Sequence, residues 1–117
     1  MTIDLLIANG TIVDPAGDVS PGDIAITGGK IARRLPAGSG ASAGEVIDAA
    51  GMHVFPGLID AHLHFGFGEP VTEYSTETVY AAQGGFTSVV GYFLSSDSYN
   101  EIFDAEYAHA APRAHVD

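Results

Sequence analysis

Short runs in which hydrophobic and polar residues alternate fill the first half of the chain, as is typical of β-strands. The Asn9-Gly10 pair predicts a type I′ hairpin because both turn positions need a positive φ, and Gly28-Gly29 predicts a second hairpin. Residues 49–51 predict a third turn, which joins two further strands. The predicted strands are Asp4–Ala8, Thr11–Val13, Asp23–Thr27, Lys30–Arg33, Glu45–Asp48 and Met52–Phe55. We therefore expect residues 1 to about 55 to be short antiparallel strands.

After Pro56 the pattern changes to strands that alternate with helices. An apolar strand ends near residue 64, a helix is predicted over 72–83, and a second strand over 86–93. The second helix opens at Ser98, where Glu101 three residues later suggests a capping box. Residues 113–117 are expected to begin a third strand. This order implies right-handed βαβ units in a parallel sheet.

The composition narrows the classes of function. The chain has 117 residues and a formal net charge of −11, with only four basic residues, so neither nucleic acid nor an anionic membrane surface is an expected partner. There is no cysteine, which excludes disulfides and thiolate metal sites. No apolar run approaches the 18 residues of a membrane span. We expect a soluble, cytoplasmic protein.

Two histidines end the apolar strand that follows Pro56. Residues i and i+2 of a strand face the same way, so His62 and His64 stand side by side, roughly 6.6 Å apart at the backbone. At that spacing both imidazoles can reach one metal ion, and Asp60 lies on the same face. A His-x-His pair alone is a weak signal, since ordinary surface or core histidines produce it too.

The residues around this pair match a family pattern. The run Phe55–His64 closely resembles the first barrel strand of the metal-dependent amidohydrolase superfamily, and residues 4–14 resemble the N-terminal strands of its cyclic amidohydrolases. Within the superfamily the hydantoinase and dihydropyrimidinase branch fits best, since residues 104–108 and 114–117 are similar to its second helix and third strand. The resemblance implies an α/β fold in two parts. Residues 1–55 would belong to a small β-sandwich composite domain. Residues 56–117 would form the first two βα units and the start of the third strand of a TIM-like (β/α)8 barrel, which is incomplete here.

The resemblance also implies an activity. His62 and His64 would hold the more buried of two divalent metal ions, usually zinc, in a hydrolase acting on the C–N bond of a cyclic amide of hydantoin or dihydropyrimidine type by metal-activated hydroxide. Asp60 would have no ligand role, and either hydrogen bonding behind the ligands or barrel packing is open for it. Phe65 and Phe67 either wall a substrate pocket or only pack the loop. The complete protein would be a homo-oligomer, a tetramer or a dimer.

Several functional groups of the family are expected beyond Asp117. These are a carboxylated lysine, two further metal histidines and the catalytic aspartate. No catalytic residue is therefore assigned within the 117 residues, and we expect this chain alone to be inactive. Gly66 stands where dihydroorotases place a substrate-binding arginine, which disfavours that activity. Acidic residues near the first helix, at positions 69, 73 and 77, are expected to form a solvated face.

Two other functions stay open at this point. The chain could be a non-catalytic truncated fragment or an interaction protein that keeps the start of the fold without its remaining metal ligands. It could also be a nucleobase deaminase of the same superfamily, which ammonia release from nucleobases would reveal.

Overall fold

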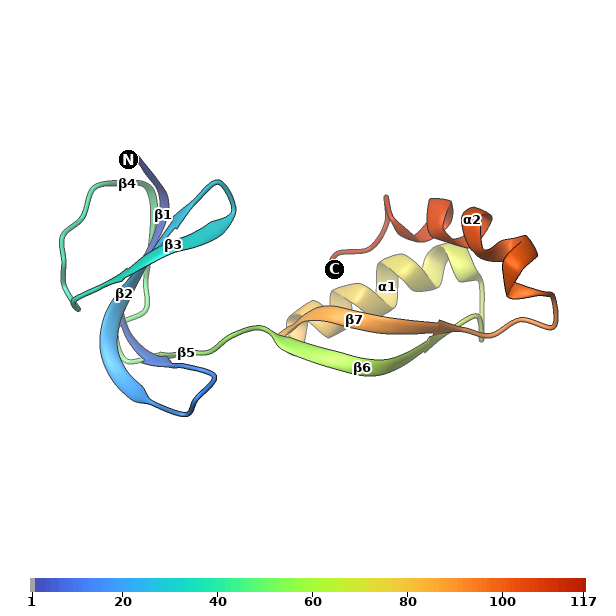
Figure 1. Cartoon of the computed structure of the whole chain (residues 1–117), viewed down its shortest axis with the longest axis horizontal. Helices are drawn as coiled ribbons and strands as arrows, with labels where there is room; N and C mark the ends of the chain where they lie inside the picture. Colours follow the sequence, from blue (N-terminus) through green and yellow to red (C-terminus); the bar gives the residue numbers. More distant parts are fainter. Residues whose placement is uncertain (1) are drawn as a thin grey trace. The chain divides into compact units, whose positions relative to one another are not determined.

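The structure, a computed structural model, describes residues 2–117, apart from the side chains of Pro70 and Val71. It divides into two compact units, one ending at Pro56 and the other spanning Gly57–Asp117. Figure 1 shows the strands of the first unit, which are β1 (Ile3–Val13), β2 (Val19–Thr27), β3 (Lys30–Leu35), β4 (Ala43–Asp48) and β5 (His53–Val54). The second unit contains β6 (Leu58–Phe65), α1 (Pro70–Gln83), β7 (Phe86–Phe93) and α2 (Tyr99–Ala110).

The first unit is one sheet with the strand order β3-β2-β1-β4, and β5 also pairs with β1. Strands β2 and β3 form the hairpin predicted at Gly28-Gly29, whose φ values of +59° and +71° suit a type I′ turn. The residues of the small core are Ile3, Leu6, Ala8 and Ala25, with Leu35, Ala41 and Ala43 packed against them.

The hairpin predicted at Asn9-Gly10 is wrong. Strand β1 passes through this pair without reversing, and its register against β2 shifts between Ile7 and Gly10. One extra residue on β1 produces a β-bulge, and Asn9 takes a φ of +62° there. Its backbone N–H donates to the Asp23 carboxylate at 2.7 Å instead of to a strand carbonyl. The same positive φ that favours a hairpin turn therefore serves a bulge inside one long strand.

The pairing predicted between the strands around residues 49–51 is also wrong. Strands β4 and β5 both run parallel to β1, in register Ile3↔Ala43 to Ala8↔Asp48 and then Thr11↔His53. The turn between them moves the chain along β1, because the Ala49 N–H donates to the Ala8 carbonyl. Alternating residues identify a strand but not its partner, so the antiparallel arrangement expected for the whole unit holds only for β1 to β3.

A buried carboxylate links three parts of this sheet. Asp23 is 0% exposed, and it accepts the backbone N–H groups of Asn9 at 2.7 Å, Ser39 at 2.8 Å and Gly38 at 3.3 Å. Burial alone would raise the pKa of Asp23, but hydrogen bonds from Ser39, Asn9 and Gly38 outweigh it and hold this pKa below its ordinary value. The carboxylate thus fixes the bulge of β1 and the loop that leads into β4.

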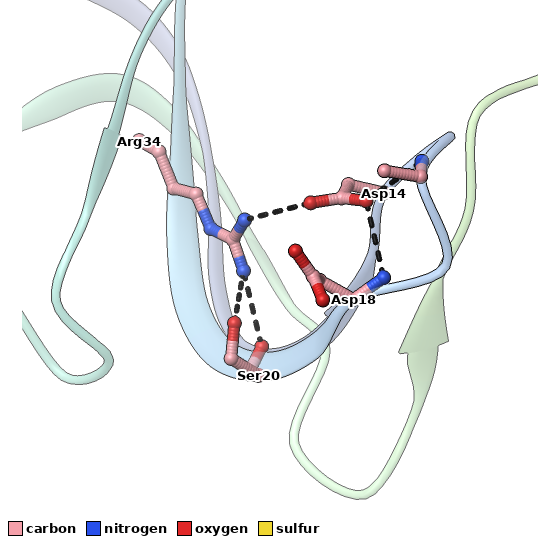
Figure 2. Close-up of polar contacts among 5 residues, drawn as sticks. Asp14, Asp18, Ser20 and Arg34 are labelled. Atoms are coloured by element: carbon pink, nitrogen blue, oxygen red, sulfur yellow. Dashed lines mark hydrogen bonds and ion pairs between the residues drawn. The ribbon is translucent and has the colours of Figure 1, made fainter.

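The loop between β1 and β2 is organised by a second aspartate, which Figure 2 shows. Asp14 accepts the backbone N–H groups of Ala16 at 2.9 Å and Asp18 at 3.2 Å. Arg34 lies 4.0 Å from the same carboxylate and also donates to Ser20. Because this ion pair is partly exposed, it adds little stability, and the bonds from Asp14 to its own loop define the turn.

In the second unit α1 packs against the parallel pair β6 and β7, as the sequence predicts. The ring of Phe65 on β6 lies 4.8 Å from that of Tyr74 on α1. The Tyr74 phenol donates to Glu106 of α2 at 3.3 Å, and burial together with the neighbouring Glu106 charge raises the pKa of Tyr74 to about 12. Gly85, with a φ of +87°, follows the last turn of α1 and allows the chain to enter β7.

Two details of the C-terminal part differ from the prediction. Ser98 is the N-cap of α2, but its side chain makes no capping hydrogen bond to any described residue, so the expected capping box does not form. Residues 113–116 are not a strand. Only Asp117 pairs with β7, donating to the Thr87 carbonyl and accepting the Val89 N–H in the pattern of a parallel ladder. Neither helix of the described residues is long and apolar enough to cross a membrane.

Candidate metal centre

Two imidazoles converge near the end of β6. The Nε2 atoms of His62 and His64 lie 2.9 Å apart, and the ring planes meet at 71°. A tetrahedral zinc ion with Zn–N bonds near 2.0–2.1 Å separates two ligand nitrogens by about 3.3–3.4 Å. The two rings would need to open by only about 0.4–0.5 Å to take such an ion. The donor atoms of this pair therefore fit one divalent metal.

The backbone that carries the pair is irregular. The register of β6 against β7 shifts between Asp60 and Leu63, which leaves an extra residue on β6. The Asp60 carboxylate accepts the backbone N–H of His62 at 2.9 Å. Of the two roles left open for Asp60, the structure thus shows a hydrogen bond, which acts on the backbone of His62 rather than on its ring.

Tyr92 contacts both imidazoles, although the sequence did not single it out. It lies opposite His64 in the parallel register of β6 and β7. Its ring stacks on that of His62 at 4.5 Å and 22°, and lies 5.9 Å from that of His64. The signal that could have found it is the alignment of the two predicted parallel strands, which places position 92 beside the histidines. Such stacking restricts rotation of the His62 ring.

The two phenylalanines expected near the site lie in different places. Phe65 is 4% exposed and packs under α1 against Tyr74, so the structure does not bring it together with the histidines. Phe67 is 78% exposed, and its ring lies 6.2 Å from that of His64 in an edge-on arrangement. Of these two phenylalanines, only Phe67 therefore lies where it could contact a molecule bound beside the histidines.

The expectation of a solvated acidic face is wrong for Glu73. Its carboxylate accepts the backbone N–H of Gly66 at 2.6 Å and also that of Gly68, so it bonds the loop that follows the histidines. Glu69 and Glu77 are exposed, as expected. Charge spacing alone could not separate these three residues, because the turn that brings Gly66 and Gly68 to α1 depends on the loop conformation.

The described residues contain no group of three or more histidine, cysteine, aspartate or glutamate side chains that could hold a metal ion. A catalytic zinc site has three protein ligands, so these two histidines alone would not complete one.

Comparison with known proteins places the chain in a family, although no protein-family model matches it. A dihydroorotase from Pelotomaculum thermopropionicum is 51% identical over 89 residues, which are 73% of this chain and 20% of that protein. A D-hydantoinase from Rhizobium radiobacter is 44% identical over 94 residues, 77% of this chain and 20% of the relative. The chain therefore spans about one fifth of the length of these curated relatives.

Solved structures agree with these relatives. An L-hydantoinase (dihydropyrimidinase) from Arthrobacter aurescens matches with a TM-score of 0.83 and 25% identity, over 99% of this chain and 27% of that protein. This likeness confirms the expected fold class, an incomplete part of a TIM-barrel hydrolase that includes a strand-rich N-terminal region. The chain belongs to the metal-dependent amidohydrolase superfamily and is hydantoinase-like within it.

Proposed function

We propose that the protein containing this chain hydrolyses the C–N bond of a cyclic amide of hydantoin or dihydropyrimidine type, with a divalent metal, zinc being the first candidate. The observation that carries this proposal is the approach of the His62 and His64 Nε2 atoms to 2.9 Å on β6. It is supported by the similarity of the chain to a D-hydantoinase and a dihydroorotase.

The side chains around the pair have separate roles in this proposal. His62 and His64 would hold the ion, Asp60 would fix the backbone of His62, and Tyr92 would limit the rotation of its ring. The metal, when bound, would lower the pKa of a water molecule towards 7 and polarise the amide carbonyl. Because the pair supplies only part of a catalytic site, we expect the 117 residues alone to be inactive.

The loop after the histidines bears on the substrate class. Gly66 has a φ of +98°, and a Cβ added there would lie 2.8 Å from the Leu94 carbonyl oxygen. This backbone disfavours an arginine at position 66, and therefore the carboxylate contact expected of dihydroorotases. Phe67 instead offers an apolar ring beside His64. Both features favour an uncharged cyclic amide, in which Phe67 would contact the ring or its substituent.

We also propose that the two units serve different purposes. Residues 1–55 would be the N-terminal part of a β-sandwich composite domain, and residues 56–117 would be the first two βα units and the start of the third strand of the barrel. In this assignment the metal pair sits on the first barrel strand, where loops at the carboxyl ends of the strands form the active site.

A substrate panel tests the proposed activity on the natural gene product that contains this chain, loaded with zinc. We expect kcat/KM for 5-substituted hydantoins or dihydrouracil to exceed that for dihydroorotate by at least about 100-fold, because no arginine receives the carboxylate at position 66. Metal-free protein is the control. Preference for dihydroorotate, or ammonia release from adenine without ring opening, would contradict the proposal.

A further inference from the structure

We propose that Glu73 is a positioning residue, which holds the loop Gly66–Gly68 beside the histidine pair and so sets how a substrate is received. This inference rests on the proposed function, since it takes the loop to be a wall of the substrate site. Glu73 itself does not contact the histidines in the structure, and it would act through the loop.

The contacts that carry the inference lie on both sides of one aromatic residue. The two carboxylate oxygens of Glu73 accept different N–H groups, Oε2 that of Gly66 at 2.6 Å and Oε1 that of Gly68. The residue between these two anchors is Phe67, whose ring lies 6.2 Å from that of His64. A single carboxylate thus fixes the backbone before and after the side chain that faces the histidines.

The position of Glu73 on α1 makes a carboxylate suitable for this purpose. It lies in the first turn of the helix, where the N-terminal end of the helix dipole favours negative charge. An ionised carboxylate offers acceptors on both oxygens, whereas a glutamine offers one acceptor oxygen and a donor NH2 group. Replacing Glu73 by glutamine therefore keeps the shape of the side chain but turns one of the two hydrogen bonds into a donor facing a donor.

The opposite side of the loop is also held. The Leu94 N–H donates to the Phe65 carbonyl at 2.9 Å, and Gly66 lies so close to the Leu94 carbonyl that a Cβ would be 2.8 Å from it. The loop is therefore held between α1 and the residue that follows β7. Loss of the Glu73 bonds would release Phe67 on one side, while the histidines stay on β6.

The test compares Glu73→Gln with Glu77→Gln in the zinc-loaded natural gene product that contains this chain. Glu77 is an exposed glutamate one turn further along α1, so it is a matched control for the loss of charge. We expect Glu73→Gln to speed hydrogen exchange of the Gly66 and Gly68 amides roughly ten-fold. We also expect it to raise KM for a hydantoin roughly ten-fold or more, because a misplaced wall binds substrate poorly. The zinc content and, within about three-fold, kcat should stay as in the wild type.

Each outcome decides the inference. Faster exchange and a raised KM in Glu73→Gln, absent from Glu77→Gln, support it. Unchanged hydrogen exchange in Glu73→Gln overturns the inference, and so does faster exchange with an unchanged KM. A loss of zinc also overturns it, because it would mean that Glu73 supports the fold as a whole. A wild-type protein that binds zinc but hydrolyses no cyclic amide would contradict the proposed function alone, and the exchange comparison would still test the hold of Glu73 on the loop.

Discussion

On the proposed function, replacing both His62 and His64 by alanine should remove zinc from the natural gene product and abolish hydrolysis of cyclic amides. Loss of a residue behind a metal ligand typically costs 10–100-fold in metal affinity, so loss of two direct ligands should cost more than about 100-fold. Each single substitution should also weaken zinc binding strongly, because in the proposed site the two Nε2 atoms, 2.9 Å apart, would share one ion. Zinc titration followed by calorimetry, with metal content by mass spectrometry, measures this effect.

His53→Ala is the matched control. His53 is exposed on β5, in the first unit, and its ring lies 6.2 Å from that of Phe55. We expect this variant to bind zinc as tightly as the wild type. Full zinc occupancy and retained hydrolysis in the double variant would contradict the assignment of the pair.

The second large effect concerns Asp23. Asp23→Asn should destabilise the first unit by about 2–4 kcal/mol, because at least one buried N–H group loses its acceptor and the charge-assisted bonds are weakened. That loss is a large part of the 5–15 kcal/mol by which domains are usually stable. Urea unfolding followed by hydrogen exchange of β1 and β2 measures it. Asp18→Asn, which changes an exposed aspartate in the same unit, should have little effect.

The same carboxylate gives the stability of this unit a pH dependence. The pKa of Asp23 in the folded state lies below its ordinary value of 3.8, so its charged form is favoured by folding. Its contribution is fully present above pH 3.8 and is lost as the pH falls through the lowered folded pKa. We expect Asp23→Asn to remove this acid dependence. An equally steep loss of stability in acid for the variant and the wild type would contradict this role.

The residue pattern predicted much of the second unit because its signals are local. The strand at 86–93 matches β7, and the helix expected over 72–83 begins only two residues earlier, at Pro70. Gly85 follows the end of that helix with a φ of +87°, a left-handed backbone that glycine adopts without strain. The family resemblance also rests on short, continuous sequence segments, and the comparisons confirm it.

Non-local contacts explain what the pattern could not predict. Taken alone, Asn9-Gly10 has the sequence of a hairpin turn. In the structure it forms a bulge, and the Asn9 N–H donates to the Asp23 carboxylate, 14 residues away in the sequence. Likewise the sequence of β4 suggests a hairpin strand, but in the structure β4 pairs in parallel with the distant strand β1. The sequence does not distinguish Glu73 from the two exposed glutamates, because its contact with the Gly66 N–H depends on how the loop before α1 folds.

The same reasoning applies to the candidate site. The spacing of His62 and His64 on one strand face predicts their approach, and this approach is what the structure shows. The position of Tyr92 beside the histidines depends on how β6 and β7 are aligned. The position of Phe65 away from the histidines depends on how α1 covers the sheet. Neither can be inferred from the segment that contains the histidines.

The most direct test is an anomalous difference map recorded at the zinc absorption edge from crystals of the zinc-loaded natural gene product. We predict a peak at about 2.0–2.1 Å from the Nε2 atoms of both His62 and His64, with the Tyr92 ring still stacked on His62. A peak bonded to only one of these imidazoles, or zinc bound at another place while their Nε2 atoms point apart, would contradict the shared metal site.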